Sequence, residues 1–333
     1  MSRAKSTKIF PITTFISDLP TNLIPQSPLS SSENGPTSGR LVIVGDVHGM
    51  RKSLEALLEN VGFDKNKGDH LILVGDLVNK GPDSPGVVDL AIKLGASAVR
   101  GNHENAVLNA TAEVKATRDS LPNYGDLTGS SAVPGNPEAN LPGDTIRDSE
   151  IPEICASPTT RATALALSER QIDWLAALPL ILRVKLPQGL TSTLGDTLIV
   201  VHAGLAPSIP PEDQDPYYLM HMRSFVCKLG DEDGLTPAES PGEESWVTEW
   251  DRWQDKLASK TTVIFGHDAK RRLQRSRYAI GLDSGCLYGN QLSAVVIEAS
   301  DGEIQHQIVQ VECADVPVAP TSSTKQDNEV VVV

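Results

Sequence analysis

Five short segments of the chain combine glycine with aspartate, histidine or asparagine, and each follows an apolar run. They are Gly45-Asp46-Val47-His48-Gly49, Gly75-Asp76-Leu77-Val78-Asn79-Lys80-Gly81, Gly101-Asn102-His103-Glu104, His202-Ala203-Gly204 and Gly266-His267-Asp268. Carboxylate and amide oxygens together with imidazole nitrogens suit a pair of borderline divalent cations such as zinc, manganese or iron. The glycines let the backbone turn tightly beside such ligands, because they carry no Cβ. The five segments therefore predict a metal centre built from distant parts of the chain.

Each segment taken alone has a plainer interpretation. An aspartate after glycine is usually a turn residue or a helix cap, and a lone histidine is usually solvated or part of a core. Taken together, the plainer interpretation fails. Three of the seven histidines in the chain (His48, His202 and His267) follow predicted buried strands, and His103 lies one residue beyond another such position. Scattered turn residues would not select histidine so consistently.

The elements that must position these segments alternate in type. Apolar runs at 41–44, 70–74 and 96–99 read as buried strands, and helical periodicity separates them at 53–61 and 85–94. Strand, helix, strand, helix, strand indicates right-handed crossovers and a largely parallel sheet. Ligands gather at the carboxyl ends of the strands in such sheets, so we expect the five turns to meet at one edge.

The remaining periodicity predicts one further region of helices and strands. Helices are expected at 167–177 and around Trp246, Trp250 and Trp253, whose spacing of i, i+4 and i+7 fits one face packed on the core. Strands are expected at 181–184, 197–201, 262–265, 279–282, 292–298 and 303–311.

Composition divides the chain into three parts. Residues 1–39 are rich in Ser, Pro and Thr and predict a flexible leader, residues 40–312 predict one folded domain, and residues 313–333 predict a flexible tail. Within the domain, a loop insertion is expected at about 111–160 and an acidic loop at 231–244.

The net charge of −14 argues against nucleic acid and anionic membranes as partners. If the substrate is a polyanion, metal ions must supply much of the local positive charge. The four cysteines form no C-x-x-C pair, which fits a reducing compartment, and no apolar run approaches the roughly 18 residues of a membrane span. No signal peptide is recognisable at the start. A cytoplasmic location is therefore expected.

The ordered run G-D-V-H-G, G-D-L-V-N-K-G, G-N-H-E, H-A-G, G-H resembles the calcineurin-like phosphoesterases over about residues 40–300. The similarity is to the branch that contains serine/threonine protein phosphatases and symmetrical diadenosine tetraphosphatases. It implies an α/β fold of four layers, an α-β-β-α sandwich with mixed sheets. It also implies a metal-dependent phosphohydrolase with two divalent ions per chain.

Residue roles follow from that resemblance by position. Asp46 and His48 would hold one metal, and Asp76 would bridge it to a second. Asn102, His202 and His267 would complete the second site. The predicted ligands of both metals together are Asp46, His48, Asp76, Asn102, His202 and His267. His103 would be the acid, or hydrogen-bond donor, beside the leaving group. Two such cations lower the pKa of a shared water towards neutrality, so that hydroxide is available to attack phosphorus.

The second motif departs from the protein phosphatases, which carry Asp and Arg where this chain has Asn79 and Lys80. Asn79 cannot stabilise an imidazolium by charge, and Lys80 lacks the bidentate fork of arginine. Lys80, Arg223 and Arg271 are the predicted substrate contacts. Each has a plainer interpretation as a solvated surface cation.

Other segments, among them 71–82, 95–104, 221–224 and 265–271, are similar to the fungal zinc-dependent endopolyphosphatase group. Inorganic polyphosphate is therefore the expected substrate, with a dinucleoside polyphosphate such as diadenosine tetraphosphate as the alternative. A protein phosphatase and a catalytically weakened scaffold are further alternatives. The same resemblance makes the vacuole the alternative to the cytoplasm.

Overall fold

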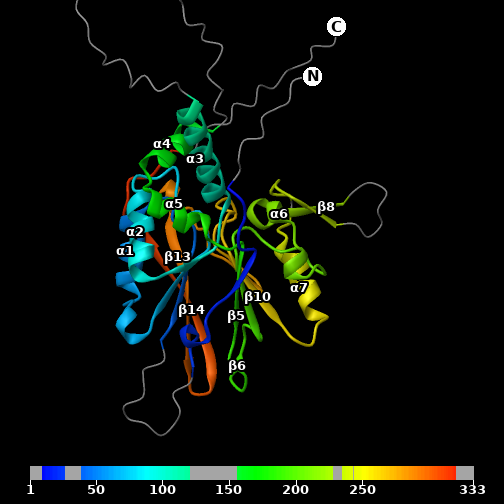
Figure 1. The fold of residues 1–333 in the computed structure, drawn as a ribbon. Coiled ribbons are helices and arrows are strands. Elements are labelled where there is room, and N and C mark those ends of the chain that lie inside the picture. Colours follow the sequence, from blue (N-terminus) through cyan, green and yellow to red (C-terminus); the bar gives the residue numbers. More distant parts are fainter. Residues whose placement is uncertain (1–9, 27–38, 121–155, 228–234, 243, 320–333) are drawn as a thin grey trace, which may run out of the picture.

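Two six-stranded sheets lie face to face in the computed structural model, with helices on both outer sides (Figure 1). The structure describes residues 10–26, 39–120, 156–227, 235–242 and 244–319. The first sheet has the order β1 (Ile16–Asp18), β5 (Ile181–Lys185), β7 (Thr197–Val201), β10 (Thr261–Phe265), β12 (Ala279–Gly281) and β11 (Gln274–Arg275). The second has the order β4 (Ser97–Ala98), β3 (His70–Leu73), β2 (Leu41–Val44), β13 (Gln291–Ser300), β14 (Glu303–Glu312) and β6 (Thr191–Ser192).

Seven α-helices and a small hairpin complete the described fold. The helices are α1 (Arg51–Asn60), α2 (Ser84–Leu94), α3 (Asn102–Ser120), α4 (Pro158–Ala166), α5 (Glu169–Ala176), α6 (Pro216–His221) and α7 (Val247–Asp255). The hairpin pairs β8 (Ser224–Cys227) with β9 (Leu235–Ala238). In Figure 1, α1 to α5 cover the second sheet and α6 and α7 cover the first. The predicted α-β-β-α sandwich with mixed sheets is confirmed.

Every residue of strand β2 is apolar, without the alternation of apolar and polar residues that a half-exposed strand has. Val42 and Val44 pack under the helices of the outer layer, whereas Leu41 and Ile43 face the other sheet. A strand that is covered on both faces must be apolar at every position. The same holds for Leu71 to Leu73 of β3 and for Leu198 to Val201 of β7, and these apolar runs are why the sequence located the strands closely.

Trp246 and Trp250 anchor the helical layer over the first sheet. Both are buried, and the ring of Trp246 meets that of Phe265 in β10 edge-on, with 4.8 Å between the ring centroids. The predicted core-facing helix is therefore present as α7. Trp253, one turn further along, is only half buried.

The predicted flexible leader is wrong for residues 10–26. Strand β1 pairs in parallel with β5, and Leu19 and Ile24 are buried between the sheets. The rest of the predicted leader, apart from Gly39, lies outside the described residues. The predicted tail is wrong at its start, because the Asp315 carboxylate accepts hydrogen bonds from the backbone and hydroxyl of Ser53.

The two predicted loops also contain regular structure. Helix α3 continues through residues 111–120, and α4 begins at Pro158, so the insertion expected at about 111–160 is helical at both ends. Its middle, 121–155, lies outside the described residues. The predicted acidic loop at 231–244 includes strand β9.

The parallel strands of both sheets end on the same side of the sandwich. Strands β2, β3 and β4 run parallel to one another, as do β7, β10 and β12. Hydrogen bonds join the turns that follow them, such as the one between the His202 ring and the carbonyl of Val74. The fold thus gathers the five glycine-containing turns at one edge, as the sequence predicted. In the described part of the chain, no helix has the length and apolar character to cross a bilayer.

Candidate metal centre

The five turns surround a cavity of about 520 Å³. Five of the six predicted metal ligands line it, and so does His103; the lining ligands are Asp46, His48, Asp76, Asn102 and His267. The sixth, His202, is fully buried directly beneath, with its ring against Asp76 and Asn102. All seven predicted metal-ligand and catalytic positions are therefore brought together, although they span more than 200 residues of sequence.

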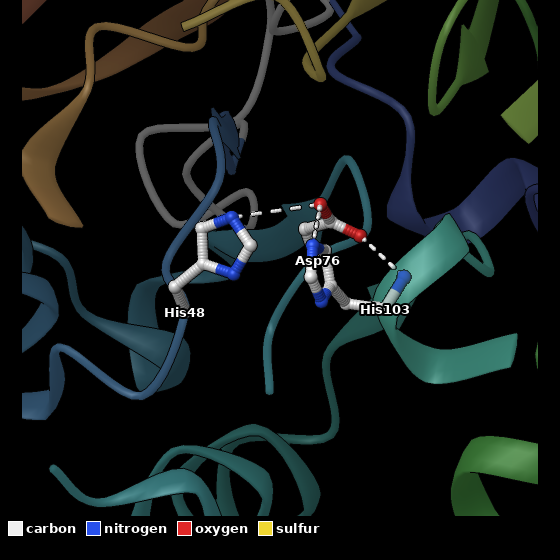
Figure 2. Close-up of side chains that lie close together, drawn as sticks. All are labelled: His48, Asp76 and His103. Atoms are coloured by element: carbon white, nitrogen blue, oxygen red, sulfur yellow. Dashed lines mark hydrogen bonds and ion pairs between the residues drawn. The ribbon is translucent and has the colours of Figure 1, made fainter. Parts of the chain in front are cut away.

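Asp76 lies at the middle of the cluster. Its Oδ2 is 3.5 Å from Nε2 of His48 and 3.9 Å from Nε2 of His103, and its Oδ1 accepts a hydrogen bond of 3.0 Å from the backbone N–H of His103. Figure 2 shows the contacts of this carboxylate with the rings of His48 and His103 and with the backbone nitrogen of His103. On the other side, Oδ1 is 3.3 Å from Nε2 of His202. One carboxylate thus contacts side chains from both halves of the cluster.

Three histidines present a ring nitrogen without a proton to the site. Nδ1 of His48 contacts the carbonyl of Val78 at 3.3 Å, and Nδ1 of His202 contacts the carbonyl of Val74 at 3.0 Å. Nε2 of His267 lies 3.1 Å from the carbonyl of His221. A carbonyl can only accept, so each of these nitrogens carries the proton, and the other nitrogen of a neutral ring keeps its lone pair. Metal-binding histidines are commonly oriented in this way.

The unprotonated Nε2 of a neutral His202 ring lies close to two oxygen atoms that are also hydrogen-bond acceptors. This nitrogen is 3.0 Å from Oδ1 of Asn102 and 3.3 Å from Oδ1 of Asp76. Three acceptors at such distances repel one another unless a positive charge lies among them. A proton on His202 or a bound cation supplies that charge, and the donor set of carboxylate, amide oxygen and imidazole is one that zinc, manganese or iron accepts. The residues present therefore fit a divalent metal.

Asp46 closes the cluster from the opposite side. Its carboxylate accepts a hydrogen bond from the backbone N–H of His267, at 3.1 Å to Oδ2 and 3.2 Å to Oδ1. Gly266 makes this approach possible, because a Cβ at that position would overlap with Oδ1 of Asp46. The ligand atoms of Asp76, His202 and His267 all lie within 4.8 Å of one another, as do those of Asp76, His48 and His103, whereas Asp46 belongs to neither group.

His103 differs from the other three histidines in its hydrogen bonding. Nδ2 of Asn79 lies 2.9 Å from Nδ1 of His103, and Oδ1 of Asn79 accepts from the backbone N–H of Lys80. Since a backbone N–H can only donate, the amide is fixed with its nitrogen towards the ring. Nδ1 of His103 is therefore an acceptor, and Nε2 of the neutral ring carries a proton towards the cavity. His103 can donate a hydrogen bond there but cannot bind a cation without changing tautomer.

The turns of the site adopt the left-handed backbone conformation at residues other than glycine. The φ angles are 46° at His48, 52° at Asp76, 74° at Asn79, 68° at Lys80 and 69° at His267. Each such residue costs of the order of 1 kcal/mol or more, and such strain persists where the surroundings enforce it. The strain is concentrated in the same turns that carry the predicted ligands, which is typical of a functional site.

The cavity concentrates buried negative charge. Burial, together with the charges of Asp283 and Asp76, raises the pKa of Asp46 well above its usual range, and burial raises the pKa of Asp283 to about 6. Burial alone would raise the pKa of Asp76 too, but the adjacent His202 and His103 hold it well below its usual range. Three carboxylates this close are stabilised by cations, which supports the fit to divalent metals.

Glu104 has a role that the sequence did not reveal. Its fully buried carboxylate accepts four backbone N–H groups, those of Asp76, Leu77, Val78 and Gly101. It therefore fixes the turn after β3 to the start of α3. Its place in the G-N-H-E motif was the only signal for it, because the four donors belong to two distant segments.

Of the three predicted substrate contacts, two line the cavity and one does not. Lys80 and Arg223 line the cavity, and burial lowers the pKa of Lys80. Arg271 does not line it, because its guanidinium pairs with Asp268 at 2.6 Å and also binds the carbonyl of Pro241. Its neighbours Lys270 and Arg272, which belong to the same basic stretch of the sequence, line the cavity instead.

Comparisons with known proteins agree with this geometry. A family model described as calcineurin-like phosphoesterase matches residues 39–295. The zinc-dependent endopolyphosphatase of Saccharomyces cerevisiae is 27% identical over 279 residues, which cover 82% of this chain and 81% of that protein. The symmetrical bis(5'-nucleosyl)-tetraphosphatase of Dechloromonas aromatica is 28% identical over 301 residues, covering 83% and 97%. A crystal structure of a candidate diadenosine tetraphosphatase matches with a TM-score of 0.59 and 31% identity, over 90% of this chain and 98% of that one.

Proposed function

The chain belongs to the calcineurin-like phosphoesterase family and is a metal-dependent hydrolase, and from this premise we propose that it hydrolyses the phosphoanhydride bonds of inorganic polyphosphate. The observation that carries the proposal is the convergence of lone pairs from His202, Asn102 and Asp76 on one point. That arrangement needs a positive charge, which a divalent metal ion would supply, and it lies beside a cavity that also holds basic side chains.

We assign the two halves of the cluster to two divalent ions. Asp46, His48 and Asp76 would hold the first, and Asp76 with Asn102, His202 and His267 would hold the second. When bound, two such ions neutralise phosphoryl oxygens and lower the pKa of a shared water. Zinc, manganese and iron all suit these ligands.

The chain's own residues then bind and orient the phosphate chain. Lys80 and Arg223 lie on the cavity wall, where their charges can hold non-bridging oxygens. His103 carries the Nε2 proton that points into the cavity, and we propose that it donates a hydrogen bond to the leaving oxygen. Such assistance is worth roughly 10²–10⁴ in rate when the donor is well placed.

Basic side chains in the cavity lining favour a polyanionic substrate once bound metal ions balance the aspartates there. Lys80, Arg223, Lys270 and Arg272 all line it, although the chain as a whole carries a net charge of −14. A local cluster of cations in an acidic protein concentrates and orients anions with several charges. A singly phosphorylated peptide would use fewer of these contacts than a polyphosphate chain.

A dinucleoside tetraphosphate is the second candidate substrate. Tyr288 lines the same cavity, and an aromatic ring there can contact a nucleoside base. The similarity to the tetraphosphatases supports this candidate at the family level. Asn79 and Lys80 argue against activity as a protein phosphatase. A catalytically weakened scaffold is disfavoured because all six predicted ligand residues are present and lie around one site.

One kinetic panel tests the proposal. The full chain is loaded separately with zinc, manganese and iron, and kcat/KM is measured for long-chain polyphosphate, diadenosine tetraphosphate, a phosphopeptide and an aryl phosphate. Polyphosphate should be the preferred substrate. Preference for the dinucleotide would select the second candidate. Fewer than one bound metal ion per chain, in protein purified without chelator, would favour the scaffold.

A further inference from the structure

A second cavity of about 470 Å³ lies between the two sheets, at the end of the sandwich away from the metal centre. Lys260 and Thr262 at the start of β10 contribute to it, whereas His267 follows the far end of that strand. His306 of β14 and Ser192 of β6 line it from the other sheet. Strand β6 is drawn at the lower end of the sandwich in Figure 1.

Positive charge dominates the lining of this second cavity. Lys260, Arg275 and Arg277 line it together with His306, and among the residues that the structure describes no carboxylate does so. The cavity is thus a basic site in a chain with a net charge of −14. Such a local excess of positive charge attracts small anions.

The three cations differ in how far they are already engaged. Nζ of Lys260 donates to the carbonyls of Gln254 and Leu257, at 2.6 and 2.5 Å. Arg277 forms an ion pair of 2.7 Å with Asp255. The guanidinium of Arg275, by contrast, forms no hydrogen bond or ion pair within the described part of the chain, and so its donors are available to a ligand.

An unpartnered hydroxyl lies in the wall of the same cavity. Thr262 is 1% exposed, and its Oγ1 has no hydrogen-bond partner among the described residues. Its neighbour along the same face, Ile264, packs between the sheets with Ile280, so the Thr262 side chain points into the space between them. A buried hydroxyl without a partner is unfavourable, and a ligand that accepts its hydrogen bond would remove that cost.

We propose that this second cavity binds a phosphate group, with Arg275 as the main ligand and the Thr262 hydroxyl as a further donor. Arginine offers a planar pair of donors that matches phosphate, and a threonine hydroxyl adds a directional contact. The group belongs either to free orthophosphate or to a phosphate chain. The choice of phosphate over other oxyanions rests on the proposed function, but binding can be measured without turnover.

The test uses the full chain with Asp76→Asn, freed of metal by chelation, so that nothing is hydrolysed. Binding of orthophosphate and of tripolyphosphate is measured by calorimetry in this background and after adding Arg275→Gln, Thr262→Val or Arg170→Gln. Arg170 is the matched control, since it is an exposed arginine on α5 and is not part of the cavity lining. Arg275→Gln should weaken binding about tenfold or more, Thr262→Val about threefold, and the control should not change it.

The outcomes separate the possibilities. Only the binding that Arg275→Gln removes belongs to this cavity. If that binding is tighter for tripolyphosphate than for orthophosphate, the ligand is a phosphate chain, and if it is equal, the ligand is a single phosphate. The proposal would be overturned if Asp76→Asn alone and Asp76→Asn combined with both Arg275→Gln and Thr262→Val bound phosphate with equal affinity. Because Thr262→Val removes only an unpartnered hydroxyl, it should keep or raise the melting temperature, so weaker binding in that variant cannot be ascribed to misfolding. The two proposals can fail separately. If Arg275→Gln abolishes binding but the wild-type protein does not cleave polyphosphate, the phosphate site is supported and the proposed function is wrong.

Discussion

Nδ2 of Asn79 donates a hydrogen bond of 2.9 Å to Nδ1 of His103, and this contact decides which ring nitrogen of His103 is protonated. The proton of the neutral ring is on Nε2, 3.9 Å from Oδ2 of Asp76. An aspartate at position 79 would accept from Nδ1 instead, and its negative charge would stabilise an imidazolium. The chain therefore holds His103 as a neutral donor rather than as a charged acid.

Replacing Asn79 with Asp should strengthen His103 as an acid. The carboxylate can still accept from the backbone of Lys80, and the Thr160 hydroxyl, which now accepts from Nδ2, can turn to donate. We expect the ratio of kcat for an alkyl phosphate to kcat for an aryl phosphate to rise about tenfold, since only the alkoxide needs strong protonation. Equal changes for both substrates would contradict this role of Asn79.

The two kinds of histidine in the cluster should respond differently to alanine. His202→Ala removes a lone pair that faces Asn102 and Asp76, so bound metal should fall by about one ion per chain, and activity should fall with it. His103→Ala should retain the metal and lower kcat by roughly 10²–10⁴. Elemental analysis and kcat on the same preparations check both. Loss of metal in His103→Ala would show that His103 is a ligand.

The sequence predicted the position of the site well because its signals are local. Strand β2 is apolar at every position because both of its faces are covered, and the turn after it carries Asp46 and His48 side by side. Once such strands are recognised as parallel, their carboxyl ends must meet. No long-range information is needed for that step.

Other features depend on contacts that no local pattern records. Strand β1 is three residues long and lies in a Ser- and Thr-rich segment, so its pairing with β5 is visible only in the fold. Arg271 and Arg272 are adjacent, yet Arg271 pairs with Asp268 whereas Arg272, which has a φ of 63°, lines the cavity. Composition alone cannot distinguish such neighbours.

Glu104→Gln should destabilise the fold and the metal centre together. Oε1 accepts from Leu77 and Val78, and Oε2 accepts from Asp76 and Gly101, so a glutamine amide would face two N–H donors in either orientation. We expect a loss of about 3 kcal/mol in the free energy of unfolding, measured with urea. Glu55→Gln, on the exposed face of α1, is the control and should change it by less than about 0.5 kcal/mol. A loss of similar size in both variants would contradict the role assigned to Glu104.

Leu19→Ala tests whether residues 10–26 belong to the folded domain. Leu19 is buried between the sheets, and its backbone N–H donates to the carbonyl of Arg183. Truncation should leave a cavity and cost about 2–4 kcal/mol of unfolding free energy. Leu165→Ala, at a position that is 55% exposed, should cost much less. Equal stability of the two variants would mean that this segment does not pack as described.

Because of His70, we expect the free energy of unfolding to fall when the pH is lowered from 6.5 to 4. The ring of His70 is buried at the start of β3, with Nε2 2.9 Å from the Ser97 hydroxyl, and burial together with the charge of Lys65 lowers its pKa to about 4. Above pH 6.5 the ring is neutral in both the folded and the unfolded chain, so it contributes no pH dependence. Between pH 6.5 and 4, His70 becomes protonated in the unfolded chain but stays neutral in the folded chain, so the free energy of unfolding falls.

His70→Gln isolates this effect, because glutamine can keep the hydrogen bond to Ser97 and does not titrate. A shift from 6.5 to about 4 corresponds to roughly 3 kcal/mol of unfolding free energy, all of it lost below pH 4. Other histidines titrate too, so the quantity to measure is the difference between wild type and His70→Gln in urea unfolding at pH 7.5, 5.5 and 4.5. That difference should shift in favour of the variant as the pH falls. A difference that stays constant with pH would show that His70 accepts its proton in the folded chain as readily as in the unfolded one.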